Sequence, residues 1–374
     1  MRQSLRTRAV LALLPALAGC GNAAGSASRS PVPPTAEFVL AAGDSTYWVT
    51  SNANGIRVRG APIDLAQVDG RFVELYVVDH ELSFAGADLI GQSVYRRDLQ
   101  TGDSTLVYTD SLVPALARQY ARAHPTDHRL GADEEPDQEP ILRAAATLDL
   151  GAAHGRFVSF SLHTDVEREG VPLWHTSRRG VIDLSAGRAA MVSDVAGAST
   201  ADVERRRDST LRTLQLGRAR LDPGSFSIAT SAGGPAITYV LPGAGPGDAG
   251  QVLALDPIGF AQPAWWRDVA SSLPMMSSSG ARDVWAHGAY SVVVRYDSTG
   301  GARLAIRDST SREWPVGPVS APATHIFWLD APHVDGPARN ALLRAFDEAA
   351  AYGSDTKVAS DQRRTARFVA AFLL

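Results

Sequence analysis

Serine, histidine and aspartate occur in two short segments that could together form a nucleophilic catalytic set. Gly43-Asp44-Ser45 offers a serine, and Asp330-Ala331-Pro332-His333 offers an acid and a base. A serine hydroxyl becomes a nucleophile when a histidine within hydrogen-bond reach takes its proton. The candidate catalytic residues are therefore Ser45, Asp330 and His333, and the chemistry would be the hydrolysis of an acyl bond.

The first of these segments resembles the nucleophile block of SGNH-type hydrolases, but its surroundings differ from that family. Residues 46–50 continue as a strand, whereas the family's nucleophile precedes a helix, and no Gly-x-Asn-Asp oxyanion block occurs in the chain. Asp-Ser-Thr also recurs at 103–105, 208–210, 297–299 and 308–310, which is typical of turns. We therefore expect no catalytic site and keep the hydrolase as the least favoured alternative.

Histidines and carboxylates also occur at spacings that a metal ion could use. His124 and His128 stand four apart, as two ligands on one helix face would, but a proline between them favours a loop. His163, Asp165 and Glu167 alternate along a predicted strand and so share one face. A dense acidic run offers the oxygen ligands that calcium prefers, at a spacing that matches no calcium loop: Asp133, Glu134, Glu135, Asp137 and Glu139. We expect solvated side chains at all three places, with no metal and no other cofactor.

The tryptophans are the remaining side chains that could meet a ligand. Trp265-Trp266 follows Pro263, and paired indoles can stack on sugar rings, although burial in a core is the simpler expectation. Nothing in the chain resembles a glycine loop that cradles phosphate or a redox motif.

Composition sets the class of protein. The chain has 374 residues, 45% of them hydrophobic, which is close to the globular average and supports two or three domains. A formal charge of −4 argues against nucleic acid as a partner. Cys20 is the only cysteine, so the chain forms no internal disulfide.

The first twenty residues have the pattern of a secretory signal. Arg2, Arg6 and Arg8 precede an apolar run over 9–18, which is too short to span a bilayer. The run closes as Leu17-Ala18-Gly19-Cys20, which resembles the lipobox of bacterial lipoproteins. The resemblance implies that residues 1–19 are a signal peptide and that Cys20 carries the lipid.

The lipobox resemblance also implies a location. It predicts a protein anchored on the periplasmic or extracellular side of a membrane, and Gly21 after the cysteine favours the outer membrane if the source has two. Residues 20–36 are rich in small and polar residues and are expected to form a flexible tether. No later stretch is long and apolar enough to be a second anchor.

An internal repeat with an offset of 85 residues organises the chain beyond the tether. Three motifs recur in one order: Ile63-Asp64-Leu65 as Leu148-Asp149-Leu150, Gly70-Arg71-Phe72-Val73 as Gly155-Arg156-Phe157-Val158, and Asp98-Leu99-x-x-Gly102 as Asp183-Leu184-x-x-Gly187. A repeat at a fixed period indicates a duplicated structural unit, so we expect 63–110 and 148–195 to superpose.

Each copy of the repeat predicts three strands followed by a helix. The strands are 72–78, 93–98 and 104–108 in the first copy and 157–162, 180–184 and 189–192 in the second, where β-branched and aromatic residues gather. Helical spacing follows at 112–120, and Ser199 with Asp202 could cap a helix towards 216. The fold class is therefore α+β, mainly β, with a duplicated antiparallel-sheet-plus-helix unit. A β-propeller is the alternative, since 85 residues is about two blades.

The second copy and its continuation also resemble a known family. The segments that carry the likeness are Phe157-Val158-Ser159-Phe160-Ser161, Asp183-Leu184-x-x-Gly187, Ser225-Phe226-Ser227-Ile228-Ala229, Ile237-Thr238-Tyr239-Val240-Leu241-Pro242 and Gly247-Asp248-Ala249-Gly250-Gln251-Val252. Their order over 150–265 is similar to the extracytoplasmic domain of the lysozyme-sensing anti-sigma factor, which also occurs beside peptidoglycan deacetylase domains. The resemblance implies a binding domain that faces the cell wall.

These segments together predict the organisation of the chain. Residues 37–140 form the first repeat domain, 141–270 the second, and 271–374 a C-terminal region with a hairpin at 290–296 and 302–307, a strand at 324–329 and a helix from Pro337. We expect a lipid-anchored binding protein of the cell envelope whose partner is the cell wall or an envelope protein. The alternative is an accessory subunit of a membrane protein complex.

Overall fold

The computed structural model describes residues 32–43, 45–131, 139–216, 221–222, 224–231, 234–241, 251–255, 263–269, 275–276, 282–330, 334 and 336–351. Pro33–Leu374 forms one compact unit. The lipobox with Cys20, most of the tether and the apolar C-terminus lie outside the described residues. Within the described ranges no helix has both the length and the apolar character needed to cross a membrane.

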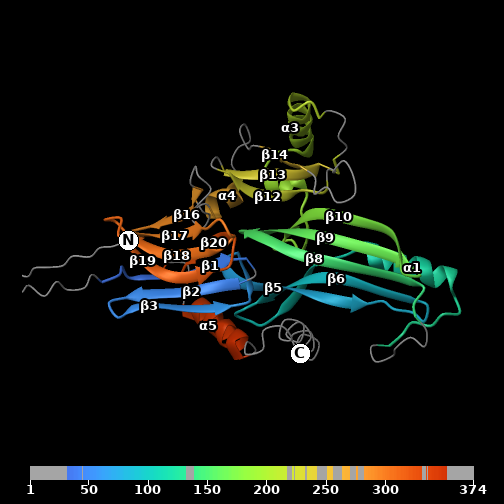
Figure 1. Cartoon of the computed structure of the whole chain (residues 1–374), viewed down its shortest axis with the longest axis horizontal. Helices are drawn as coiled ribbons and strands as arrows, with labels where there is room; N and C mark the ends of the chain where they lie inside the picture. The colour runs from blue at the N-terminus through green and yellow to red at the C-terminus, as the bar shows by residue number, and fades with distance from the viewer. Residues whose placement is uncertain are drawn as a thin grey trace, which may run out of the picture. The chain divides into compact units, whose positions relative to one another are not determined.

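The described residues of this unit form four sheets and five helices, so the α+β, mainly β class is confirmed (Figure 1). The strands of the first sheet are β20 (Ala323–Trp328), β1 (Ala36–Ala42), β2 (Ser45–Asn52) and β3 (Gly55–Ala61). The largest sheet holds β4 (Asp64–Val68), β5 (Arg71–Glu81), β6 (Ala87–Asp98), β7 (Ser104–Thr109), β8 (Leu142–His154), β9 (Phe157–Arg168), β10 (Val171–Asp183) and β11 (Arg188–Ala189). The others hold β12 (Ser227–Ser231), β13 (Gly234–Leu241) and β14 (Gln251–Leu255), and then β15 (Met275–Met276), β16 (Arg282–His287), β17 (Tyr290–Tyr296), β18 (Ala302–Asp308) and β19 (Glu313–Val319).

The two repeat copies share one continuous sheet. Its order is β11-β10-β9-β8-β6-β5-β4, with β7 on the side of β6. The copies join where residues 87–90 of β6 pair in parallel with residues 142–145 of β8. The β-propeller alternative is therefore wrong, because blades are separate sheets and these copies are hydrogen-bonded into one.

The same turn closes the second hairpin of both copies. The Asp98 carboxylate accepts the backbone N–H groups of Gln100 and Thr101, and the Asp183 carboxylate, 85 residues later, accepts those of Ser185 and Ala186. Each aspartate also pairs with an arginine at the same offset, Arg71 at 3.1 Å and Arg156 at 3.4 Å. Gly102 and Gly187 adopt φ of 81° and 62°, as the turn requires of a residue without a Cβ.

The copies differ after this turn. β7 runs for six residues, whereas β11 has only two, so the strand expected at 189–192 is wrong. The reason is a helix start, because the Asp194 carboxylate accepts the Met191 N–H and begins α2 (Val192–Ala196). The expected capped helix is present as α3 (Thr200–Thr213), where the Ser199 hydroxyl accepts the Asp202 N–H.

Helices close the cores of the sheets. The first copy's helix, α1 (Leu112–Ala123), buries Val113, Ala117 and Tyr120 against the eight-stranded sheet, as its spacing predicts. The C-terminal helix α5 (Gly336–Ala351) buries Leu342 and Phe346 against β2 and the start of β5. The short α4 (Ala264–Val269) packs beside the three-stranded sheet.

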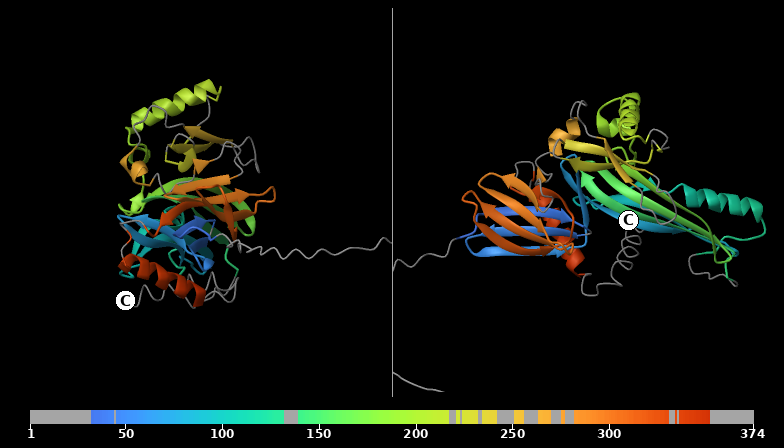
Figure 2. Two further views of the ribbon diagram at one scale, coloured as in Figure 1. Left: turned by 90° about the vertical axis from the view of Figure 1, so that its left-hand side faces the viewer. Right: turned by 45° about the horizontal axis from the view of Figure 1, so that its top comes forward.

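The C-terminal region is joined to the N-terminal strands. The expected hairpin and strand are present as β17, β18 and β20, and β20 pairs antiparallel with β1. The sheet of β16–β19 shares a core with β1 and β2, and Figure 2 shows its orange strands stacked on the blue ones. Residues nearly 300 positions apart in the sequence thus lie in one sheet.

Candidate functional site

The structure separates the candidate nucleophile from the candidate acid. Ser45 opens β2 and pairs with Ala42 at the end of β1, where β20 begins, whereas Asp330 follows the far end of β20. β1 rises about 3.3 Å per residue, so the two side chains are roughly 20 Å apart. Asp330 accepts instead from His287 Nε2 at 2.9 Å. His333, like Asp44, lies outside the described residues.

The candidate metal ligands that the structure describes are not gathered into one site. His124 ends α1 and stacks on Tyr120 at 4.4 Å, while Asp165 bonds His175 at 2.7 Å. Of the acidic run only Glu139 is described, and it pairs with Arg143. Among the described residues no group of three histidine, cysteine or carboxylate side chains could hold a metal ion.

The paired tryptophans belong to the packing of α4. Trp265 donates its indole N–H to the Val195 carbonyl at 2.9 Å and packs edge-on against Phe157, and Trp266 is buried. This arrangement offers no open platform for a sugar ring, so the simpler expectation of burial is confirmed.

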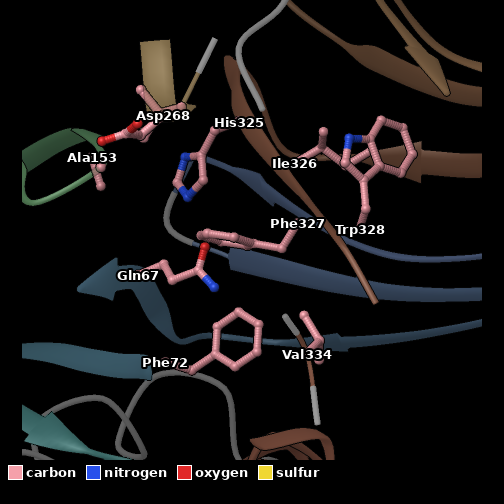
Figure 3. Close-up of a pocket in the computed structure, with 11 residues that line it drawn as sticks. Gln67, Phe72, Ala153, Asp268, His325, Ile326, Phe327, Trp328 and Val334 are labelled. Carbon is pink, nitrogen blue, oxygen red and sulfur yellow. The ribbon is translucent and has the colours of Figure 1, made fainter. Parts of the chain in front are cut away.

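A small pocket lies where β20 meets the ends of β4 and β8. It has a volume of about 80 Å³, which is room for two or three water molecules. Figure 3 shows the His325 imidazole among Gln67, Phe327 and Asp268. The ring packs edge-on against Phe327 at 4.6 Å, and its Nε2 has no hydrogen-bond partner.

A second buried histidine, His154, lies close enough to His325 for their charges to interact. Burial lowers the pKa of His154 to about 4. A hydrogen bond to the Ile228 backbone raises this pKa, but by less than burial lowers it. Burial and then the neighbouring His154 lower the pKa of His325 to about 3. Both rings are therefore neutral near pH 7, and the pocket is too small for an organic ligand.

A larger groove crosses four strands at the other end of the eight-stranded sheet. Its volume is about 520 Å³, within the range of ligand sites. Strand pairing sets two rows of outward side chains across it. These rows are Ile90, Ala145, Asp165 and His175, and Asp88, Arg143, Glu167 and Pro172. The small Ala145 leaves the hollow between longer neighbours.

Carboxylates dominate the charge of this groove. Asp88, Asp165 and Glu167 face a single permanent cation, Arg143, which pairs with Glu167 at 3.6 Å. The Asp165 side chain keeps 71% of its exposure beside His175, so most of its surface is open to a ligand. The surface is thus acidic and can accept hydrogen bonds.

One wall of the groove is an exposed apolar segment of β10. Residues 171–178 are all exposed, and they include Leu173 at 52% and Trp174 at 37%. A β-bulge between Pro172 and Trp174 offsets this part of the strand from β9. Large exposed apolar side chains beside a concave surface are typical of binding sites.

Only part of this surface is predicted from the sequence. His163, Asp165 and Glu167 are expected to share a strand face, and Asp165 and Glu167 do line the groove. The sequence motifs do not predict Val171-Pro172-Leu173-Trp174 as site residues. An apolar run directly after the Glu169-Gly170 turn is nevertheless visible in the sequence. That the run is exposed depends on which strands cover it.

Comparisons with known proteins define no relative of this chain. No family model matches it, and no curated protein does. The polysaccharide lyase Uly1 is similar at 9% identity and a TM-score of 0.22, over 79% of this chain and 58% of the lyase. A puromycin hydrolase is similar at 13% identity and a TM-score of 0.12, over 83% of this chain and 55% of the hydrolase. The chain spans less than two thirds of either protein, and these TM-scores define neither its fold nor its activity.

Proposed function

We propose that this chain is a lipid-anchored binding protein of the bacterial cell envelope. Cys20 holds the lipid, residues 20–36 act as the tether, and the compact unit presents its acidic groove to a cell-wall or protein partner. The observation that carries the binding role is Trp174, which lies exposed with Leu173 at the rim of that groove. The lipobox pattern and the likeness of 150–265 to a wall-facing sensor domain support the location.

The separation of Ser45 from Asp330 argues for binding in preference to hydrolysis. A serine nucleophile needs its base and acid within hydrogen-bond reach, and the pairing of β1 with β20 holds these residues at opposite ends. The described part of the chain brings no other serine–histidine–carboxylate set together at the groove.

Two measurements test the proposal. Mass spectrometry of the native protein should find Cys20 at the N-terminus with acyl chains attached, and an intact Met1 or a free Cys20 thiol would contradict the anchor. A photo-crosslinking amino acid at position 174 should capture a partner in intact cells, whereas the same probe at Leu214, exposed on the distant α3 end, should not. Equal capture at both positions would contradict the groove as the binding surface.

The captured material also separates the two envelope roles. Membrane subunits in stoichiometric amounts would favour the accessory-subunit alternative. A glycan or a soluble envelope protein would favour the wall-facing role.

A further inference from the structure

The internal repeat makes β6 a template for β10. The two strands end in the same aspartate turn 85 residues apart, and the equivalent pairs Arg97–Ser104 and Ile182–Ala189 open the next strand. At this offset Leu89 corresponds to Trp174, Ile90 to His175 and Gln92 to Ser177. The segments that pair with the edge of β6 therefore indicate what kind of segment fits the edge of β10.

In the first copy this edge is fully occupied. Residues 87–90 of β6 pair in parallel with the start of β8. Further along, the Gln92 carbonyl accepts the Asp110 N–H at 2.8 Å, and Ser93 pairs with Thr109 of β7. Leu89 is fully buried in the core that also contains Val113, Ala117 and Tyr120 of α1.

In the second copy, none of the described strands covers the corresponding edge. The Arg179 N–H donates to the Ser225 hydroxyl, and the Val181 carbonyl accepts the Ala190 N–H, so from His175 onwards, after the bulge, the odd-numbered residues of β10 direct their backbone groups away from β9. The backbone groups of His175 and Ser177 point the same way. No strand in the described part of the chain lies beside them.

We propose that a partner adds a strand to β10 along residues 174–178, which correspond to the stretch of β6 that the start of β8, Asp110 and the end of β7 cover in the first copy. This inference rests on the proposed binding function and specifies how the partner binds. An unpaired edge offers main-chain hydrogen bonds to any extended segment, and neighbouring pockets select its side chains. Trp174, 37% exposed where its counterpart Leu89 is fully buried, is the apolar surface that the added strand covers.

The groove defines the chemistry of that segment. Side chains of an added strand alternate between faces, so one set meets Trp174 and the other meets Asp165 and Glu167 beside His175. An apolar residue suits the first face and a basic residue the second. β8 has this pattern where it joins β6, since Leu142 is followed by Arg143, which pairs with Glu167. The partner is therefore a protein with an extended segment of alternating apolar and basic residues.

A synthetic peptide that copies residues 142–148 is the probe, added to the full-length protein in detergent. Hydrogen exchange of the His175 and Ser177 amides should slow at least tenfold at saturation. Ser177→Pro removes one outward N–H without removing a bond to β9, and should weaken peptide binding at least tenfold. Ser177→Thr keeps the N–H and should bind as the unchanged protein does. A peptide with Arg143→Glu should bind about tenfold more weakly at low salt.

Three results would overturn the inference. They are protection of amides outside the β10 edge, unchanged binding by Ser177→Pro, and no protection at about 1 mM peptide. The inference can also fail while the proposed function stands. If the probe at position 174 still captures the native partner in Ser177→Pro cells, the chain binds at this surface without adding a strand. If that probe captures nothing in the unchanged protein, the proposed function itself fails.

Discussion

His154 and His325 illustrate how single residues couple this fold to pH. Each is almost fully buried, each has one ring nitrogen without a described partner, and each lies on a different sheet. A neutral imidazole is tolerated in such a place, whereas an imidazolium must be taken from water into a poorly solvating interior. The cost of that charge is what lowers the pKa of each ring.

We predict that acid destabilises the protein through these two residues. Because the pKa of His154 is about 4 when folded and 6.5 when unfolded, the folded protein binds fewer protons between these values. Stability is therefore full above pH 6.5 and is lost as the pH falls towards 4, by about 3 kcal/mol for His154 alone. Urea unfolding between pH 7.5 and pH 4 measures the loss.

Matched histidine variants test the assignment of this acid sensitivity. His325→Gln should flatten the dependence of the unfolding free energy on pH, whichever way it changes the stability at pH 7.5. His128→Gln, at an exposed position with no described partner, should leave the dependence unchanged. If the unfolding free energy depends on pH as strongly in both His325→Gln and His154→Gln as in the unchanged protein, the acid sensitivity comes from carboxylates elsewhere.

The aspartate turn is the element that both copies of the repeat preserve. In each copy one carboxylate accepts two backbone N–H groups and an arginine, and a glycine with positive φ completes the turn. The register of the preceding hairpin still differs by one residue, since Asp98 pairs with Val73 and Asp183 with Phe157. The turn is thus set locally, and the strands adjust to it.

We predict that Asp98→Ala and Asp183→Ala each lower the free energy of unfolding by about 1–2 kcal/mol, because each leaves two N–H groups without their acceptor. Asp103→Ala is the control, since its exposed side chain has no described partner and should change stability by about 0.5 kcal/mol at most. Denaturant unfolding at pH 7 provides the comparison. Equal effects of Asp98→Ala and Asp103→Ala would show that the turn does not depend on the carboxylate.

On the scale of the molecule, strand pairing links regions that the sequence predicts to be separate domains. The boundary at 140 falls between β6 and β8, which are neighbours in one sheet, and β20 of the C-terminal region pairs with β1. Within the described residues of the compact unit from Pro33 to Leu374, no sheet is confined to 37–140.

We predict that a variant beginning at Pro33 unfolds in a single transition. Loss of any one region would expose the paired edge or the shared core of its neighbour, so partial unfolding is costly. Far-ultraviolet circular dichroism and tryptophan fluorescence should report the same midpoint in urea. Two separated midpoints would mean that 271–374 or the first repeat copy unfolds independently.

Local patterns were sufficient for many elements of this fold. The spacing of apolar residues predicts α1 and α5, Ser199 with Asp202 predicts the start of α3, and Gly102 and Gly187 predict turns with positive φ. These features depend on contacts within a few residues, and the repeat at 85 is visible because both copies keep the same local turn. The third strand expected at 189–192 is cut short because the Asp194 carboxylate accepts the Met191 N–H and begins α2 there.

The candidate surface required contacts that no local pattern encodes. The alternation of Asp165 and Glu167 predicts that they share one strand face. Their neighbours from β6 and β8 are set by pairing between strands that lie tens of residues apart in the sequence. Leu89 and Trp174 occupy equivalent positions in the repeat, and the first is buried while the second is exposed. Burial depends on which strands and helices cover each copy. Composition and spacing could therefore reveal the duplicated unit, and only the folded chain shows that, among the described strands, none pairs with residues 174–178 of β10 on the side away from β9.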